Sequence, residues 1–406
     1  VAKDAATFAD SLDIDVAKDA YLRLYVVDTV GELTNAGNTF VDAELAATSV
    51  STTGGFLRLG ANVSTTGMFS LANTETDQGE IYVAGDQTIT TGGGLTGDGK
   101  IDVGGSTLTL SQGAEATSTF RGNIVQDTNA QTGEFTLTGG GHLILEGETD
   151  QVSLSKLNVT NGKLSLNGSE LLVDTIEVLV DQLGTLVAFG DETVSAVTVA
   201  GDATTKTYGA LHLYEALTAT DVSNSGEIFV DAGTEIETIS DSESGLETSN
   251  GSLTATGTIT NTAYLVQDGS VSADVKVVNN GLWAVVDDET LTITNTTGGL
   301  VTDAGLTGAG TFCLETSGAD AAVCNTAEAP EADVAAAATT LTLDQAGSST
   351  FDGKFEGLGA LNKTGAGSLS LTVAQSFLGG LTVSEGEVVA KDAATFADSL
   401  DIDVAK

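Results

Sequence analysis

The pentapeptides GEIYV (residues 79–83) and GKIDV (residues 99–103) share one pattern, a glycine followed by alternating polar and apolar residues. GHLIL (141–145), GKLSL (162–166) and GEIFV (226–230) repeat it further along the chain. The spacings of the successive glycines are close to one, two, one and three multiples of about 21 residues, which is the size of one coil of a parallel β-helix. The alternation predicts short strands with one face turned inward. A coil can bury that face only by stacking on its neighbours.

We therefore expect an all-β chain that folds as a β-solenoid, with about 20–21 residues per coil, in the form of an elongated rod. Glycine is expected at each strand start because a corner requires dihedral angles that other residues resist. The composition agrees with this fold, since the chain holds 50 glycines but a single proline. Aromatic residues make up only 5% of the chain, so the core is expected to consist mainly of valine, leucine, isoleucine and alanine.

The two ends of the sequence carry the same segment. Residues 1–18 read VAKDAATFADSLDIDVAK, and residues 389–406 read the same eighteen letters. This repetition indicates a tandem array, in which residues 1–388 form one continuous repeat unit and residues 389–406 begin the next copy. A duplicated terminal cap is the alternative interpretation.

The charge balance excludes several partners. The chain has 57 acidic and 14 basic residues, for a net charge of −43, and its only arginines are Arg23, Arg58 and Arg121. A protein that binds nucleic acid needs a basic face that neutralises phosphates, and a protein that binds an anionic membrane surface needs a basic face as well. We therefore expect no nucleic-acid partner and no membrane-surface partner. No run of eighteen apolar residues is present, so we also expect no membrane-spanning helix in this stretch of chain.

Two residue sets are candidate sites. Cys313 and Cys324 lie close in sequence without a Cys-x-x-Cys spacing, which favours a disulfide that closes an inserted loop at about residues 313–339. A disulfide indicates an oxidising compartment outside the cytoplasm, while two unrelated small core residues are the alternative. The carboxylates of Asp10, Asp13, Asp15 and Asp19 form the best candidate for weak calcium binding. A solvated acidic surface is the alternative, and we expect no other metal or cofactor.

Residues 359–388 read GALNKTGAGSLSLTVAQSFLGGLTVSEGEV. This block resembles the passenger-associated repeat of bacterial autotransporter proteins. The matching positions are Lys363, Thr364, Gly365, Gly367, Leu369, Leu371, Phe377, Gly379, Gly380, Val383 and Gly386. The resemblance is confined to this block, and it implies a right-handed parallel β-helix exported to the cell surface, as in giant tandem-repeat surface or fibre proteins.

The function expected from these features is structural. We expect a repeat unit of a long extracellular bacterial fibre, attached to the cell surface or present as a filament, with a surface, cell–cell contact or matrix role. Its expected partners are further copies in tandem and like fibres bundled side by side. An autotransporter-type adhesin passenger is the alternative. A polysaccharide-active enzyme is less favoured, because enzymes that act on acidic sugars need basic residues and this chain has few.

Single residues give weaker signals. His142 and His212 each occupy an alternate position of an apparent strand, which predicts an outward-facing polar residue and no zinc site. Trp283 is the only tryptophan, and we expect it to cap a coil corner or make a lateral contact. An outward platform for sugar stacking is the alternative for this residue.

Overall fold

The computed structural model describes residues 12–25, 28–126, 132–146, 152–167, 171–178, 184–188, 192–202, 205, 207–230, 252–267, 269–285, 290–294, 305–314, 340–391, 396 and 402–404. These residues form β-strands joined by turns, with no helix among them. All the strand pairs of the solenoid are parallel, as the sequence predicts, and the described strands make about 14 turns. The chain divides into two compact units, residues 1–195 with 207–209 and residues 196–206 with 210–406.

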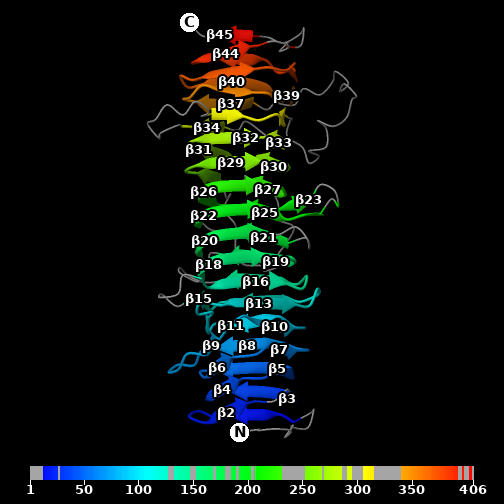
Figure 1. Ribbon diagram of the computed structural model, residues 1–406, viewed down its shortest axis with the longest axis vertical. Helices are drawn as coiled ribbons and strands as arrows, with labels where there is room; N and C mark the ends of the chain where they lie inside the picture. Colours follow the sequence, from blue (N-terminus) through cyan, green and yellow to red (C-terminus); the bar gives the residue numbers. More distant parts are fainter. Residues whose placement is uncertain are drawn as a thin grey trace. The chain divides into compact units, whose positions relative to one another are not determined.

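The strands of the first unit are short, and Figure 1 shows them lying side by side from β2 onward. Their bounds are β1 (Ile14–Val16), β2 (Tyr21–Leu24), β3 (Asp28–Asn35), β4 (Asn38–Val41), β5 (Leu45–Thr53), β6 (Phe56–Leu59), β7 (Val63–Thr65), β8 (Phe69–Ala72), β9 (Glu80–Val83), β10 (Gln87–Thr91), β11 (Leu95–Gly97), β12 (Lys100–Asp102), β13 (Thr107–Gln112), β14 (Thr117–Phe120), β15 (Asn123–Val125), β16 (Glu134–Thr138), β17 (His142–Glu146), β18 (Val152–Val159), β19 (Gly162–Asn167), β20 (Leu171–Val178), β21 (Gly184–Ala188) and β24 (Thr207–Tyr208). Strand β22 (Glu192–Val199) contains the unit boundary.

Three sheets surround the core of the first unit. The first runs through β7, β10, β13 and β16, and the second through β8, β11, β14, β17, β19 and β21. The third runs through β2, β4, β6, β9, β12 and β15, and we call it the β2–β15 sheet. Long strands bend round a corner and serve two sheets: β5 pairs with β7 through Leu45 and with β8 through Val50.

The second unit is built in the same way. Its strands are β23 (Gly201–Asp202), β25 (Ala210–Leu213), β26 (Ala216–Asn224), β27 (Glu227–Val230), β28 (Ser252–Ala255), β29 (Thr258–Asn261), β30 (Tyr264–Gln267), β31 (Ser270–Ala273), β32 (Lys276–Asn279), β33 (Leu282–Val285), β34 (Thr290–Ile293), β35 (Gly305–Thr307), β36 (Thr311–Leu314), β37 (Thr340–Gln345), β38 (Ser349–Phe351), β39 (Lys354–Gly357), β40 (Ala360–Thr364), β41 (Ser368–Leu371), β42 (Ser376–Phe377), β43 (Leu381–Val383), β44 (Glu387–Ala390) and β45 (Ile402–Val404). One sheet runs from β27 through β30, β33, β36 and β39 to β42, and another from β28 through β31, β34, β37, β40 and β43 to β45.

The length of a coil varies with its corners. Leu341 pairs with Leu361 and Leu361 with Leu381, so these coils have the length that the sequence pattern predicts. Asp28 pairs with Leu45, a nearer partner than a regular coil would give. Thr290 pairs with Thr342, which is more than twice as far along the chain as the next regular coil. The strands therefore stay in register although the segments that connect them differ greatly in length.

The core consists of the inward residues of each strand, mostly leucine, valine and isoleucine. In the second unit it also holds rings, because Trp283, Phe312, Phe355 and Phe377 are fully buried. Trp283 stacks on Phe312 and Phe312 on Phe355, with 5.2 Å between the ring centroids in each pair. The prediction that Trp283 caps a corner or makes a lateral contact is wrong, and so is the alternative of an outward platform. The alternation in LWAV places this ring inside, where its Nε1 donates a hydrogen bond to Gln267 Oε1.

Candidate functional site

The predicted calcium residues lie at the first strands of the chain. Asp15 is exposed on β1, and Asp13 Oδ1 accepts a hydrogen bond from the Glu32 amide at 2.8 Å. Asp19 has a φ of 64° and lines an open pocket, while Asp10 lies outside the described residues. Within the part of the chain that the structure describes, no three metal-ligating side chains come together. Calcium binding at these aspartates stays a prediction.

The predicted disulfide involves one residue that the structure describes. Cys313 is fully buried in β36, beside Val266 and Ala284, and it is disulfide-bonded. Cys324 and almost all of the predicted inserted loop, apart from Cys313 and Leu314, lie outside the described residues. The Cys313–Cys324 pairing therefore stays a prediction, which peptide mapping of non-reduced protein would test.

Both histidines occupy outward positions of their strands, as predicted. His142 lies on β17, its Nε2 is 2.8 Å from Ser165 Oγ, and burial lowers its pKa to about 4, helped by the charge of Lys163. His212 stacks on Phe229 with 4.5 Å between ring centroids. Neither ring is part of a group that could hold a metal among the described residues.

Lys363 is a site that sequence reasoning treated only as a motif position. Its strand, β40, alternates so that Leu361 and Lys363 point inward, and the lysine side chain is fully buried. Its Nζ donates hydrogen bonds to the carbonyl oxygens of Thr364, Gly365 at 2.8 Å and Gln345 at 3.4 Å. Burial lowers the pKa of this amine, against the charges of Asp344 and Glu385. The amine thus links the ends of two strands, and it faces carbonyl groups rather than a cleft.

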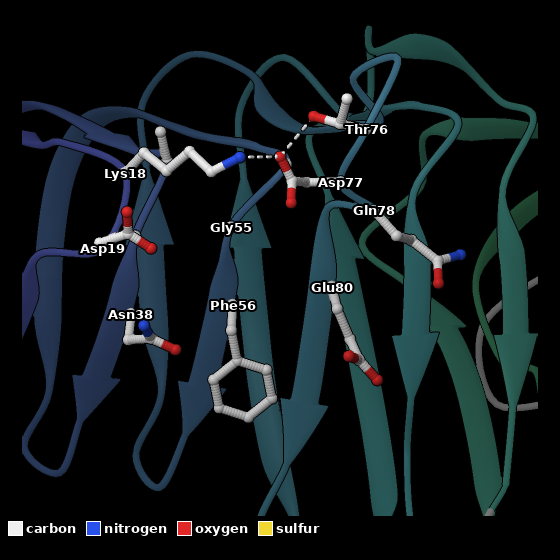
Figure 2. Close-up of a pocket in the computed structure, with 12 residues that line it drawn as sticks. Lys18, Asp19, Asn38, Gly55, Phe56, Thr76, Asp77, Gln78 and Glu80 are labelled. Atoms are coloured by element: carbon white, nitrogen blue, oxygen red, sulfur yellow. Dashed lines mark hydrogen bonds and ion pairs between the residues drawn. The ribbon is translucent and has the colours of Figure 1, made fainter.

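An open pocket lies at the N-terminal ends of strands β4, β6 and β9 in the β2–β15 sheet (Figure 2). Asn38, Phe56 and Glu80 stand side by side on β4, β6 and β9, where they are cross-strand partners. Above them, Lys18 Nζ donates to Asp77 Oδ2 at 2.6 Å. Lys18 and Asp77 are both well exposed to solvent, so this ion pair contributes little stability. The pocket therefore combines one aromatic ring with amide and carboxylate groups.

Aromatic rings continue from this pocket across the outer surface of the β2–β15 sheet. Tyr21, Phe40, Phe56 and Tyr82 come from β2, β4, β6 and β9, and we call them the aromatic face. The Tyr21 and Phe40 rings stack at 4.8 Å between centroids, and Phe40 and Phe56 lie 6.0 Å apart. Tyr21 is 56% exposed and Tyr82 is 37% exposed. Most other phenylalanines that the structure describes are buried, so the outward Phe40 and Phe56 are unusual for this chain.

Ion pairs surround the aromatic face. Arg23 and Arg58 both bind the carboxylate of Asp42, Arg58 at 2.9 Å. The Arg23 guanidinium also lies over the ring of Tyr25, 4.6 Å from its centroid. Lys100 Nζ is 3.0 Å from both Glu80 and Asp102. These three cations and three carboxylates balance, whereas the whole chain carries −43.

Sequence reasoning missed this face although its signal is present. The strands YLRL (21–24), NTFV (38–41), FLRL (56–59) and EIYV (80–83) each place outward residues at their first and third positions. Reading those positions down the four strands gives Tyr, Asn, Phe and Glu in one column, and Arg, Phe, Arg and Tyr in the next. The register between strands was needed to align these columns, and the sequence alone supplied it only for coils of constant length.

The fold and this surface define a parallel β-solenoid with one aromatic, charge-balanced outer face. No family model, curated protein or solved structure matches the chain. No helix among the described residues is long and apolar enough to cross a bilayer.

Proposed function

We propose that this chain is a structural repeat unit of a long extracellular bacterial fibre or filament. The observation that carries the proposal is the repeated segment, of which the structure describes part of both copies. Ile14–Val16 forms β1 and pairs with β3, a later strand, whereas the identical Ile402–Val404 forms β45 and pairs with β43, an earlier one. A single copy of the segment could therefore join the coil before it to the coil after it.

The burial of the two copies supports this proposal. Val16 is 5% exposed, but the equivalent Val404 is 61% exposed. Ile402 is also more than half exposed, at 52%. Apolar side chains gain free energy when they leave water, so β45 would be stabilised by coils that follow it as β3 follows β1. Further copies of the repeat in tandem are the proposed partners, and lateral bundling with like fibres is part of the proposal.

Denaturing electrophoresis of isolated fibres tests the tandem array. We expect bands far above 40.8 kDa, the mass of this chain, because the repeats would be covalently joined. A single band near the mass of one repeat would contradict the proposal, since separate subunits would then stack without a covalent link. Reduced and non-reduced samples should agree, which excludes disulfide-linked oligomers as the source of the high mass.

An autotransporter-type adhesin passenger is the second candidate. The block of residues 359–388 favours it through its resemblance to the passenger-associated repeat, and its strands β40 and β41 pair with strands of the next coil, Leu361 with Leu381 and Leu369 with Val388. The test is export of the chain fused between a secretion signal and an outer-membrane translocator. Cleavage by protease added to intact cells would support this candidate, and retention inside the cell would contradict it.

We propose no catalytic role and no cofactor, and weak calcium binding at the predicted aspartates is the one ligand left to test. The aromatic face carries no histidine, and the cations beside it are paired with carboxylates. Incubating the protein with neutral and acidic polysaccharides, followed by an assay for new reducing ends or unsaturated products, tests this proposal. Sustained turnover by purified protein would contradict it and would favour the polysaccharide-active enzyme.

A further inference from the structure

We propose that the aromatic face binds a linear, uncharged polysaccharide that lies across strands β2, β4, β6 and β9. This inference goes beyond the proposed fibre function and does not rest on it. It concerns a binding surface within the first unit, made by residues from consecutive coils. The pocket at the N-terminal ends of β4, β6 and β9 would supply hydrogen-bonding groups through Asn38 and Glu80, on either side of Phe56.

The rings form a path with a regular step. Tyr21 and Phe56 occupy one outward column of the sheet, while Phe40 and Tyr82 occupy the next. Neighbouring strands lie about 4.8 Å apart, so the path presents a ring at each strand and alternates between the two columns. A pyranose ring has a length comparable to this step and exposes flat patches of C–H groups. Aromatic side chains offer a large, rigid apolar surface for such patches.

Polar side chains lie between the rings. Asn38 is the cross-strand neighbour of Tyr21 on one side and of Phe56 on the other, and Glu80 follows Phe56 in the same column. An amide both donates and accepts hydrogen bonds, and a carboxylate accepts them at two oxygens. Vicinal hydroxyl groups of a sugar match planar groups of this kind. A few polar groups among apolar contacts are typical of ligand sites, where they fix orientation.

The charge of the face indicates an uncharged ligand. Arg23, Arg58 and Lys100 are balanced by Asp42, Glu80 and Asp102, so the face itself is close to neutral. The net charge of −43 repels polyanions from the molecule as a whole. A polycation would find stronger attraction on the acidic remainder of the surface. A neutral polymer meets neither repulsion on this face nor a stronger competitor elsewhere.

A second copy of the chain is the competing occupant, because aromatic residues and arginine are also enriched in protein interfaces. The charges argue against it. The balanced face of one copy offers no excess of cations to offset the net charge of −43 on the other, so we place the proposed lateral bundling of fibres outside this face. Sedimentation of the wild type and of a variant without the exposed rings separates the two occupants.

The test is affinity electrophoresis of the full 406-residue chain in native gels that contain hydroxyethyl cellulose, xylan, dextran or amylose, with polygalacturonate as the anionic comparison. We expect at least one neutral polymer to retard the protein and polygalacturonate not to do so. Titration with the hexasaccharide of the retarding polymer should then show binding that changes little between about 50 and about 500 mM salt, because no net charge is neutralised.

The variant Tyr21→Ala/Tyr82→Ala removes the two most exposed rings of the face. We expect its affinity to fall about tenfold or more, because the two rings supply the most exposed, rigid apolar surface of the face. Both tyrosines are well exposed, so the variant should keep the circular dichroism and the melting temperature of the wild type. Tyr208→Ala on β24 removes a half-buried tyrosine ring outside the face and serves as the control, and it should bind like the wild type.

Three results would overturn the inference. The first is that no neutral polymer of the panel retards the wild-type chain. The second is that the double variant binds as tightly as Tyr208→Ala. The third is self-association of the wild type in sedimentation experiments that the double variant abolishes, which would assign the aromatic face to a second copy.

Discussion

Lys363 is a position of the sequence motif, and in the structure its buried amine donates hydrogen bonds to backbone carbonyl groups. Its position in β40 follows the inward pattern of the strand, yet its amine reaches the carbonyl oxygens of Thr364, Gly365 and Gln345. A buried carbonyl without a donor is costly, so the lysine satisfies groups that an apolar residue would leave unpaired. The motif could be recognised from the sequence. The burial of its lysine could not, because a lysine is almost never fully buried.

The first prediction concerns Lys363→Met. At neutral pH we expect the variant to be less stable by about 1–3 kcal/mol, because carbonyl oxygens lose their donor. Burial holds the pKa of Lys363 below its ordinary value of 10.5, so the folded state releases this proton before the unfolded state does. Wild-type stability attributable to Lys363 therefore rises as pH increases toward 10.5. Urea unfolding at neutral pH and near pH 10 should show the gap between wild type and variant widening, and a constant gap would contradict this account.

His142 supplies a prediction in the acid range. Its folded pKa of about 4 lies below the ordinary 6.5, so between these values the unfolded state binds the proton and the folded state does not. The stability that wild type draws from a neutral His142 is complete above pH 6.5 and is lost as pH falls toward 4. Since the ring is partly exposed, we expect a loss of about 1–2 kcal/mol after solvent screening, below the limit set by the pKa difference.

His142→Gln isolates this effect from the titration of the many carboxylates. The variant should lose less stability than wild type when urea unfolding is repeated at pH 7 and near pH 4.5. His212→Gln is the matched control, because it removes the other outward-facing histidine, whose ring stacks on Phe229. Equal acid sensitivity of wild type and His142→Gln would show that the histidine is protonated without cost in the folded state.

At the scale of elements, a ladder of asparagines connects neighbouring coils inside the second unit. Asn224 Nδ2 donates to Asn261 Oδ1, and Asn261 Nδ2 donates to Asn279 Oδ1, both at 2.9 Å. All three side chains are buried. Each asparagine satisfies polar groups of the coil beside it, so the ladder fixes the stacking of β26, β29 and β32 at their ends.

Asn261→Ala tests the ladder. We expect a destabilisation of about 2–5 kcal/mol, because the change removes one hydrogen bond from a buried side chain on each of the two neighbouring coils. Thermal unfolding followed by circular dichroism measures it. Thr260→Ala changes the adjacent outward residue and should alter stability by less than about 1 kcal/mol. Similar effects of both substitutions would mean that the ladder adds nothing beyond ordinary strand packing.

Glycines at strand starts fulfil a different requirement from the one expected. Gly162 has a φ of 102°, which agrees with a conformational need. For Gly79, Gly99 and Gly141 the structure shows close approach of the preceding chain instead. A Cβ on Gly99 would lie 2.4 Å from Leu71 Cγ and 2.5 Å from Gly79 O. These glycines therefore permit the contact between successive coils.

Gly99→Ala should accordingly destabilise the first unit by about 1–3 kcal/mol or more, the range that overpacking costs. Gly85→Asn is the comparison. Gly85 differs from Gly99 in having a positive φ, of 83°, but an added Cβ there meets nothing closer than 3.7 Å, and asparagine tolerates such angles. Differential scanning calorimetry of both variants should show a large loss for Gly99→Ala and a small one for Gly85→Asn. The reverse order would refute close approach as the reason for glycine.

The strand pattern was the part of the fold that could be predicted. GEIYV and GKIDV form β9 and β12, which pair in neighbouring coils with the predicted step, Glu80 with Lys100. The extrapolation from residue 99 to residue 141 fails, because GHLIL forms β17 in a different sheet of the unit. The spacing between Gly99 and Gly141 resembles two regular coils only because the corners between these strands differ in length. Corner lengths depend on solvent-exposed segments with no periodic pattern, so the register and the aromatic face that depends on it required the structure.

At the scale of the whole molecule, the dominant quantity is the net charge of −43. Like charges repel within the folded chain, and salt screens that repulsion. We expect the melting temperature to rise between about 50 and about 500 mM sodium chloride. A melting temperature that falls with salt would show that attractive ion pairs, such as those of Asp42, outweigh the repulsion.

The same measurement, repeated with calcium chloride at matched ionic strength, tests the calcium prediction. Site binding would raise the melting temperature further than sodium does, and Asp13→Asn/Asp15→Asn would remove the additional increase. Glu75→Gln/Glu115→Gln is the control with the same change in charge. If both variants respond to calcium as wild type does, the acidic segment acts only as a solvated surface.

The unequal steps between paired strands bear on how such a molecule can change over generations. Neighbouring coils keep their register whether the partners are as near in sequence as Asp28 and Leu45 or as distant as Thr290 and Thr342. Lengthening a connecting segment costs little free energy, because the entropy of closing it grows only slowly with length. Selection can therefore act almost separately on the segments of the gene that encode strands and on those that encode corners. Strand segments must keep their alternation of polar and apolar residues. Corner segments can accept insertions, change sequence or shorten while the stacked strands stay in place.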